Sequence, residues 1–323
     1  MVVDAARRAK SFRGRLRSGK DAELSAIRSV QLHRVGSMKE RVTFKSGNLT
    51  LVGELSVPDG GSGRKPAIII MHGFGGHRDG PQQRWSERFY NGLGYATLRF
   101  DFQGCGESEG ERGWVLPLRQ VADAIGALDY LSGRPEIDPK RICLSGTSFG
   151  ASVSVYTAGL DARVAAVIGQ GGWANGEHMF RAIHSTPEKW AKFSDLLVRG
   201  RARKSSVPPI MAHRYDLIVI PERLRANVDT RSIMQFPVEM ALETLAFNPG
   251  DLAARIAPRP LLLIHSAQDE VISADGSMEL FKCAGYHGDL HIMGCVDHFM
   301  FGEDDNRVAD IMTNWLARYF PAA

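Results

Sequence analysis

The sequence alternates short apolar runs with segments of helical periodicity, and this alternation leaves few folds open. Apolar runs typical of buried strands occupy 67–72, 96–101, 141–146, 164–169, 260–266 and 289–293. Helical periodicity occupies 82–93, 118–131, 151–160, 278–283 and 306–319. Two further β-rich runs, 41–45 and 49–57, precede them. Strands that alternate with helices pair in parallel through right-handed crossovers, so we expect an α/β fold with a doubly wound, mostly parallel sheet.

One connection is far longer than the few residues that usually join such elements. About ninety residues separate the run that ends at Gly169 from the run that starts at Pro260. Its helical stretches are broken by prolines, namely Pro187, Pro208, Pro209, Pro221, Pro237 and Pro249. We interpret 171–258 as a helical cap inserted into an α/β core that consists of 36–170 and 259–323.

Residues 1–35 form a basic extension ahead of this core. Its segment Arg7–Lys20 carries arginines and lysines and no acid, although the chain of 323 residues has a net charge of only +4. A nucleic-acid arm or a targeting peptide stays open, but a solvated, partly helical extension is favoured because only Phe12 interleaves the charges with an aromatic ring. No apolar run is long enough to cross a bilayer. We therefore expect no nucleic-acid partner and no membrane association, and we leave a homodimer open.

The cysteines do not indicate a metal site. Cys105, Cys143, Cys283 and Cys295 lack the paired C-x-x-C spacing of metal ligands. Cys143 lies inside an apolar run, where a free cysteine serves as a small buried side chain. Free cysteines suit a reducing compartment, so we expect a cytoplasmic protein without a metal or another cofactor.

The pattern G-x-S-x-G, typical of nucleophilic serines, occurs twice, at 146–150 around Ser148 and at 106–110 around Ser108. A nucleophile elbow needs a strand that runs directly into a sharp turn and then a helix. Ser148 follows a strand-like apolar run and precedes a helix of small residues that starts at Ala151. Ser108 follows a loop and stands between two glutamates, whose charge would oppose an oxyanion. We therefore predict Ser148 as the nucleophile and Ser108 as a loop residue.

A serine nucleophile needs a base and an acid that orients the base, and in this topology the acid comes before the histidine in the chain. Asp269 follows the run 260–266, at the carboxyl edge of the sheet where the elbow also lies. His298 follows the next strand and reaches the same edge. We predict that His298 takes the Ser148 proton through Nε2 and that Asp269 holds the other ring nitrogen. Two neighbouring acids stay open as alternatives to Asp269, namely Glu270 and Asp275.

The oxyanion that forms during acyl transfer needs two fixed backbone N–H donors. One is the N–H of Phe149, directly after the nucleophile. We place the other at Phe74, in the glycine-rich turn after the first long apolar run. The same turn offers a weaker alternative, a metal site made by His72, His77 and Asp79. No second cluster of ligands completes that site, so we prefer the oxyanion hole.

Together these motifs resemble the α/β-hydrolase superfamily. The resemblance rests on His72-Gly73-Phe74, the turn 101–108, the Ser148 elbow, Asp269 and His298, which occur in that order. Within the superfamily they are most similar to the dienelactone-hydrolase-like and cinnamoyl (feruloyl) esterase branch and to prolyl-oligopeptidase-type catalytic domains. The resemblance covers about 41–320 apart from the cap, and it implies an α/β-hydrolase fold in which the turn 101–108 is a structural loop beside the active site.

The cap lies over the strand edge that carries the nucleophile, so we expect it to determine the substrate. It is rich in aromatic side chains, from which we take as candidate substrate-binding residues Trp173, Phe180, Trp190 and Tyr215. Such side chains would favour an apolar or aromatic substrate. The basic stretch 189–204 could attract an anion, but a solvated helix face is the favoured interpretation.

We therefore predict a serine hydrolase that cleaves a small, apolar or aromatic carboxylic ester through an acyl-enzyme intermediate. Its partner would be a small acyl compound. The same triad equally suits an amidase, a peptidase or a hydrolase of carbon–carbon bonds. A non-catalytic ligand-binding protein is a remote alternative, because no member of the triad is missing.

Overall fold

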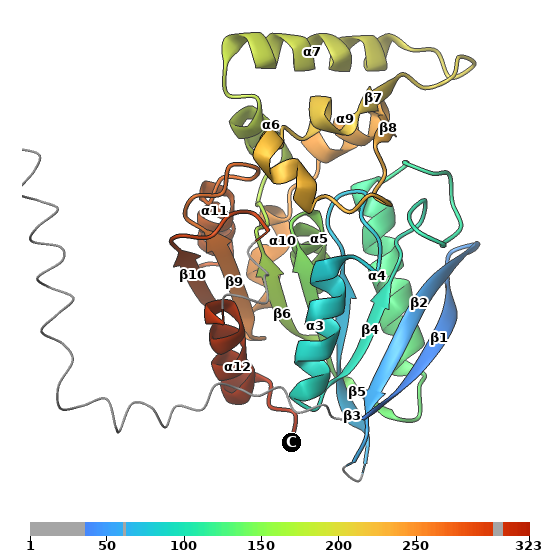
Figure 1. Ribbon diagram of the computed structural model, residues 1–323, viewed down its shortest axis with the longest axis vertical. Helices are drawn as coiled ribbons and strands as arrows, with labels where there is room; N and C mark the ends of the chain where they lie inside the picture. Colours follow the sequence, from blue (N-terminus) through green and yellow to red (C-terminus); the bar gives the residue numbers. More distant parts are fainter. Residues whose placement is uncertain (1–35, 61–62, 300–305) are drawn as a thin grey trace, which may run out of the picture. The chain divides into compact units, whose positions relative to one another are not determined.

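The computed structural model describes residues 36–60, 63–299 and 306–323, so the extension expected at 1–35 lies outside the described residues. An eight-stranded sheet runs through the described part, in the order β1-β2-β4-β3-β5-β6-β9-β10 (Figure 1). β2 pairs antiparallel with β1 and β4, and the remaining neighbours pair in parallel. The strands are β1 (Ser37–Ser46), β2 (Leu49–Pro58), β3 (Lys65–Met71), β4 (Ala96–Phe100), β5 (Ile137–Thr147), β6 (Val164–Gln170), β9 (Leu261–Ser266) and β10 (Asp289–Met293).

The burial of each strand follows its place in the sheet. In the central strand β3 every residue from Pro66 to Met71 is buried, which is why this strand is a continuous apolar run. The edge strand β1 instead alternates, with Val42 and Phe44 turned inward between exposed neighbours. The doubly wound, mostly parallel sheet predicted from the sequence is confirmed, although β5 begins at Ile137 rather than at Arg141.

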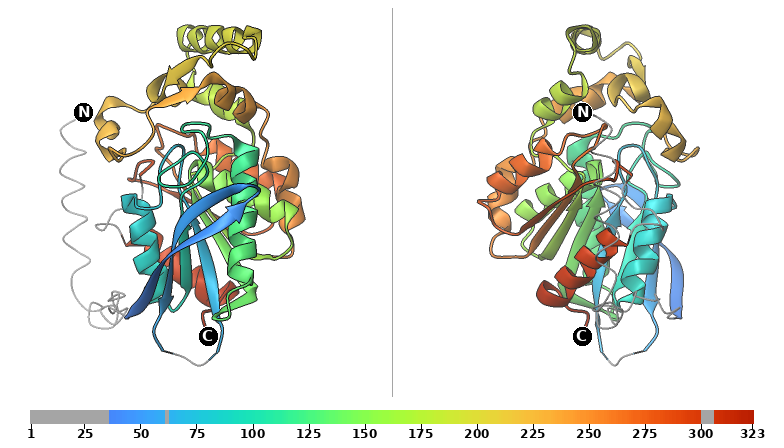
Figure 2. Two further views of the ribbon diagram at one scale, coloured as in Figure 1. Left: turned by 90° about the vertical axis from the view of Figure 1, so that its right-hand side faces the viewer. Right: turned by 60° about the vertical axis from the view of Figure 1, so that its left-hand side comes forward.

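Helices cover both faces of the sheet (Figure 2). Against one face, Phe89 of α3 and Trp315 of α12 share a core cluster with Ile68 of β3. Against the other face, the core cluster includes Leu128 of α4, Val153 of α5 and Leu280 of α11. These helices are α3 (Pro81–Gly92), α4 (Pro117–Ser132), α5 (Phe149–Leu160), α11 (Asp275–Cys283) and α12 (Arg307–Tyr319).

The segment 171–258 between β6 and β9, called the insert below, contains several helices and two short strands. Figure 1 shows α6, α7 and α9 beyond one end of the sheet, whereas α10 lies beside α5. A two-stranded antiparallel sheet, β7 with β8, also occurs there and was not predicted, because three-residue strands are too short to show a period of two. The elements are α6 (Gly176–Ile183), α7 (Pro187–Ala202), β7 (Met211–His213), α8 (Arg214–Leu217), η1 (Glu222–Asn227), β8 (Gln235–Pro237), α9 (Val238–Leu245), α10 (Gly250–Ala253) and η2 (Ala254–Ile256).

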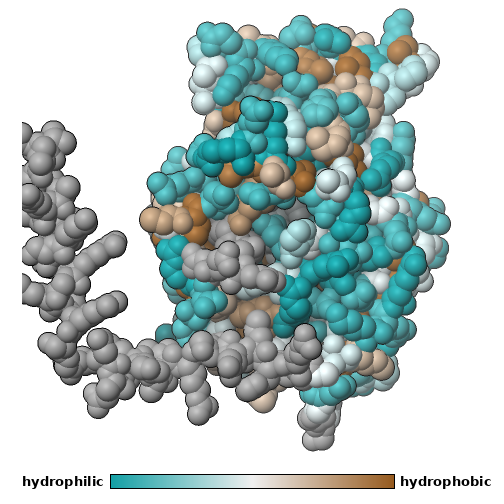
Figure 3. All heavy atoms as spheres, viewed as in Figure 1, coloured by the Kyte–Doolittle hydropathy of each residue, from teal (hydrophilic) through white to brown (hydrophobic). Residues whose placement is uncertain are grey.

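The surface is polar over most of the face seen in Figure 3, where hydrophobic side chains form small separate groups. Among the described residues, no helix has both the length and the apolar character that crossing a membrane requires.

Candidate active site

Ser148 lies in the turn between β5 and α5, with a φ of 54° and a ψ of −119°. A positive φ strains a residue that has a side chain, and this strain is typical of a nucleophile elbow. Packing requires glycine on both sides of the serine. A Cβ at Gly146 would lie 2.1 Å from the Gly150 oxygen, and a Cβ at Gly150 would lie 2.7 Å from the Met71 oxygen. The backbone at Ser148 therefore has the elbow conformation, and the flanking glycines permit it.

The three residues predicted as a triad lie within hydrogen-bond distance of one another. His298 Nε2 is 3.1 Å from Ser148 Oγ, and His298 Nδ1 is 2.6 Å from Asp269 Oδ2. Asp269 follows β9 and His298 follows β10, so parallel pairing of these strands brings both loops to the edge where β5 ends. The Asp269 side chain has no exposed surface and that of His298 is only 8% exposed.

Both oxygens of the Asp269 carboxylate have partners inside the protein. Its Oδ1 accepts hydrogen bonds from the N–H groups of Val271 and Ile272, both at 2.8 Å. Its Oδ2 faces His298 and a second buried histidine, His265, whose Nε2 is 3.2 Å away. Burial alone would raise the pKa of Asp269, but the electrostatic interaction with the adjacent His298 ring and these hydrogen bonds outweigh burial and hold the pKa well below its usual range. Asp269 is therefore ionised at neutral pH and fixed in orientation.

The neighbouring acids are engaged elsewhere. Glu270 pairs with Arg223 on the surface, and Asp275 accepts a hydrogen bond from Ser273 Oγ at 3.0 Å. These two alternatives to Asp269 therefore have other partners, whereas Asp269 contacts the His298 ring.

The glycine-rich turn after β3 lies directly against the elbow. A Cβ at Gly73 would lie 3.4 Å from the Cβ of Ser148. His72 holds the turn from inside: its Nδ1–H donates to the Gly73 oxygen at 2.8 Å, and its Nε2 accepts from the N–H of Phe102 at 3.3 Å. Burial lowers the pKa of His72 to about 4, so the ring is neutral at pH 7 and supports this one pattern of donor and acceptor.

The two backbone N–H donors predicted for the oxyanion hole lie on either side of the contact between this glycine-rich turn and the elbow. Phe149 is the first residue of α5, and the rings of Phe74 and Phe149 lie 5.9 Å apart. Among the hydrogen bonds formed within the described residues, neither the Phe74 N–H nor the Phe149 N–H has an acceptor. Both N–H groups are therefore free to bind an oxyanion.

The alternative metal site does not form in the turn. His72 uses both ring nitrogens within the protein, and Asp79 forms an ion pair with Arg99. His77 Nδ1 accepts from the Asp79 N–H at 3.2 Å, and its Nε2 lies 3.2 Å from Asp229. No group of three or more metal-binding side chains occurs in the part of the chain that the structure describes.

The second G-x-S-x-G serine lies in a structural turn. Ser108 Oγ donates to the Asp101 oxygen at 2.5 Å and accepts from the N–H of Val52 at 2.9 Å. These bonds tie the end of the turn 101–108 to its own first residue and to β2. Ser108 is therefore a loop residue that joins two strands and has no histidine beside it among the described contacts.

A cavity of about 410 Å³ opens beside Ser148 and His298. Its apolar wall comes from the glycine-rich turn 72–76 after β3 (called the oxyanion turn below), from the insert and from the loops after β9 and β10. It includes Phe74, Ile218, Ile220, Val228, Val271 and Phe299. Its polar lining includes His77, Gln83, Arg214, Asn227, Asp229 and Ser232. The volume falls in the range typical of small-molecule sites.

None of the four aromatic residues proposed for substrate binding lines this cavity, so the structure does not place them there. Trp173 and Phe180 are almost fully buried, and the Trp173 ring lies 5.4 Å from that of Phe149. Trp190 lies under Arg181, and Tyr215 lies under Arg225. Large rings offer the most apolar area to bury, and here they build the core and surface packing of the insert.

The cavity wall of the insert comes instead from shorter side chains in irregular segments. Ile218 and Ile220 follow α8, and Val228 follows η1. Isolated aliphatic residues beside Pro221 show no hydrophobic periodicity, so the sequence does not tell whether their side chains line a cavity or pack in the core. His265, which contacts Asp269, was not predicted from the sequence. Its position at the end of an apolar run, four residues before Asp269, could have indicated this contact.

Comparison with known proteins identifies the family of the chain. The family model described as "Serine aminopeptidase, S33" matches residues 62–305. The quorum-quenching protein AidA of Acinetobacter baumannii is 39% identical over 278 residues, which cover 79% of this chain and 87% of AidA.

Two solved structures share the fold. The hypothetical protein PA2218 of Pseudomonas aeruginosa superposes with a TM-score of 0.77 at 22% identity, covering 88% of this chain and 94% of that one. Est1E of Butyrivibrio proteoclasticus, solved with ferulic acid bound, superposes with a TM-score of 0.64 at 17% identity, covering 86% of this chain and 98% of that one. The predicted resemblance to α/β hydrolases is confirmed, and the chain belongs to the S33 serine aminopeptidase family of α/β hydrolases.

Proposed function

We propose that the chain is a serine hydrolase that cleaves a small carboxylic ester with an apolar or aromatic group, through an acyl-enzyme intermediate. The observation that carries this proposal is the line of contacts Asp269–His298–Ser148, which ends at the wall of the cavity. A serine hydroxyl becomes a competent nucleophile when a histidine of fixed orientation takes its proton.

The reaction then proceeds in two steps. Ser148 Oγ attacks the ester carbonyl carbon while His298 Nε2 takes the hydroxyl proton, and the N–H groups of Phe74 and Phe149 bind the carbonyl oxygen as it becomes negative. When the tetrahedral intermediate collapses, His298 gives the proton to the leaving alcohol and Ser148 keeps the acyl group. Water then attacks the acyl-enzyme, His298 accepts a proton from it, and the acid leaves as Ser148 regains its proton.

The cavity supports a small apolar acyl group. Its volume of about 410 Å³ lies toward the lower end of the roughly 300–1,000 Å³ of small-molecule sites. Aliphatic and aromatic side chains from the insert and from the core face it, including Ile218 and Val271. Each methylene buried there contributes about 0.8 kcal/mol, or up to about fourfold in kcat/KM.

The charges in the cavity favour an ester over the N-terminal residue of a peptide. Among its described lining residues Asp229 is the one carboxylate that could hold a substrate ammonium group. Its oxygens already accept hydrogen bonds from the N–H and the guanidinium of Arg231, at 2.9 to 3.2 Å, and face His77. An ammonium group would therefore have to compete with an arginine that is already bound.

Hydrolysis of p-nitrophenyl acetate, butyrate and hexanoate by the purified chain tests the proposal. We expect kcat/KM to rise along the series, and we expect Ser148→Ala to lose turnover. Ser108→Ala is the matched control, because it removes the serine of the other G-x-S-x-G pattern and should keep kcat. Equal turnover by wild type and Ser148→Ala would refute the assignment, and turnover of alanine p-nitroanilide without any ester turnover would favour the peptidase alternative.

A further inference from the structure

The turn that carries Phe74 is held by the insert as well as by the core. The N–H of Ile233 donates to the Gly75 oxygen at 2.9 Å, and Arg214 Nη2 donates to the Phe74 oxygen at 2.5 Å. The ring of Phe236 stacks on the ring of Phe74 with centroids 4.3 Å apart. Contact is so close that a Cβ at Gly75, which has a φ of +53°, would lie 2.5 Å from the Phe236 ring.

Arg214 joins the two sides of this contact. Its Nη1 donates to the Ile233 oxygen at 2.8 Å while its Nη2 donates to Phe74, so one guanidinium bridges a carbonyl of the insert and a carbonyl of the oxyanion turn. The planar fork of arginine suits such a bridge, because its donors keep a fixed angle to one another. The guanidinium also lies over the rings of Phe74 and Phe236, at 5.4 and 5.9 Å.

This arrangement is costly for the folded state. Arg214 is only 7% exposed, and none of the ion pairs within 36–60, 63–299 and 306–323 includes it. Its Nε is buried without an acceptor. Burial lowers the pKa of Arg214 to about 10, so the side chain remains charged at pH 7. A buried charge without a carboxylate costs free energy, and a hydrophobic side chain of similar length would avoid that cost.

We propose that Arg214 is a positioning residue for the oxyanion hole, which it holds open through Phe74. This inference rests on the proposed serine-hydrolase function. The N–H and the C=O of Phe74 flank a single Cα. When Arg214 fixes the carbonyl and Phe236 fixes the ring, the N–H keeps one direction, toward the junction with Ser148. The insert thereby contributes to the rate of the reaction as well as to the shape of the cavity.

Arg214 also lines the cavity, so a direct contact with an anionic substrate is the competing explanation. The two roles differ in what they change. A positioning residue stabilises the transition state, so its loss lowers kcat for a neutral ester and leaves KM little changed. A residue that binds substrate charge raises KM, and only for substrates that carry the charge.

The test compares Arg214→Met and Arg214→Lys with wild type, using neutral p-nitrophenyl butyrate. We expect kcat of both variants to fall on the order of 10- to 100-fold with little change in KM, because displacing one oxyanion donor by about 1 Å costs about that much. Lysine keeps the charge but is a point donor that cannot bridge both carbonyls, so Arg214→Lys should restore little of the lost kcat.

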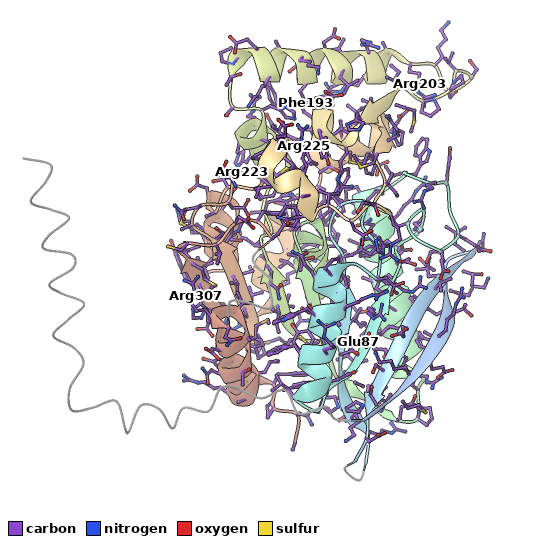
Figure 4. All side chains as sticks on the ribbon, in the orientation of Figure 1. Glu87, Phe193, Arg203, Arg223, Arg225 and Arg307 are labelled. Atoms are coloured by element: carbon purple, nitrogen blue, oxygen red, sulfur yellow. The ribbon has the colours of Figure 1, made fainter. Side chains whose placement is uncertain are left out.

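A second readout uses phenylboronic acid, which Ser148 converts to a tetrahedral anion with one oxygen in the oxyanion hole. We expect its affinity to fall with kcat in both variants. The matched control is Arg203→Met: Arg203 also bridges partners within the insert, Glu239 and the Val207 oxygen, at the end of α7 and far from the sheet (Figure 4). It should lose stability without losing kcat.

The outcomes separate the inference from the function on which it rests. Wild type that neither hydrolyses the ester nor binds the boronic acid refutes the proposed function, and the role of Arg214 with it. Active wild type with unchanged kcat in Arg214→Met, full rescue by lysine, or a rise in KM alone overturns the inference and leaves the function intact. If Arg214→Met fails to fold, Phe236→Leu keeps the apolar volume, removes the ring stack and must show the same loss of kcat.

Discussion

Replacing Asp269 with asparagine changes one atom in the site, and the surrounding donors decide how the new amide lies. The position of Oδ1 receives two backbone N–H groups, from Val271 and Ile272, so the amide oxygen must lie there. The NH₂ group then occupies the position of Oδ2 and points at His298 Nδ1. His298 Nδ1 must accept this hydrogen bond, which moves the ring proton to Nε2, opposite Ser148 Oγ.

This tautomer cannot take the serine proton, so we expect a large loss of kcat. Holding the histidine of a serine triad in the wrong tautomer costs about 10⁴-fold in kcat, a value measured by the same substitution in another serine hydrolase. At about 1.4 kcal/mol for each factor of ten, the loss is about 5.5 kcal/mol of transition-state stabilisation. The rigidity of the two N–H donors argues against a smaller effect, because flipping the amide would leave both of them facing NH₂.

The assay is steady-state hydrolysis of p-nitrophenyl butyrate, with thermal unfolding to show that the variant is folded. Asp275→Asn is the control, since Asp275 is one of the two acids that the sequence left open and it contacts Ser273 rather than His298. It should keep wild-type kcat. A folded Asp269→Asn that retains more than about a tenth of kcat would contradict the assigned tautomer and the role of Asp269.

Three further outcomes follow from particular contacts. His265→Phe keeps the ring shape but leaves the Ile272 oxygen and Ser277 without this partner, so urea unfolding should show a loss of about 1–3 kcal/mol while kcat falls less than in Asp269→Asn. Gly146→Ala places a Cβ 2.1 Å from a backbone oxygen, so ester turnover should be lost even where circular dichroism shows a folded chain. The pKa of His72 is about 4 in the folded chain and 6.5 in the unfolded chain. Its contribution to the free energy of unfolding is therefore fully present above pH 6.5 and is lost as the pH falls toward 4. The free energy of unfolding should decrease by about 3 kcal/mol over that range, and His72→Gln should lack this decrease.

The sheet and the elbow could be predicted because both impose strong local constraints on sequence. A strand covered on both faces, such as β3, must be apolar at every position, so a run like Ile68-Ile69-Ile70 is typical of such a buried strand. The elbow excludes side chains at Gly146 and Gly150 for steric reasons that any chain of this fold shares. Position at the end of β5 then distinguished Ser148 from Ser108, which the motif alone could not do.

The cavity wall could not be predicted in the same way, because no local rule separates a lining side chain from a packed one. Trp173 and Phe180 were reasonable candidates by size, yet size is also what the core of the insert requires. The residues that line the cavity, such as Ile218 and Val228, come from short irregular segments whose direction depends on tertiary packing. The sequence around Arg214 does not indicate its proposed role either, because that role depends on its contacts with the Phe74 and Ile233 oxygens in the folded chain.

The insert contacts the candidate active site in two places, at the cavity and at the oxyanion turn. We expect these contacts to affect how activity varies within the family. Ile218 and Ile220 face the cavity, so changing them alters the burial of the substrate and hence KM. Arg214 and Phe236 contact the oxyanion turn instead, so changing them alters what is bound only in the transition state. The residues of the predicted triad lie in loops of the core, outside the insert. Differences in kcat between relatives with an identical triad should therefore follow the contacts that their inserts make with this turn.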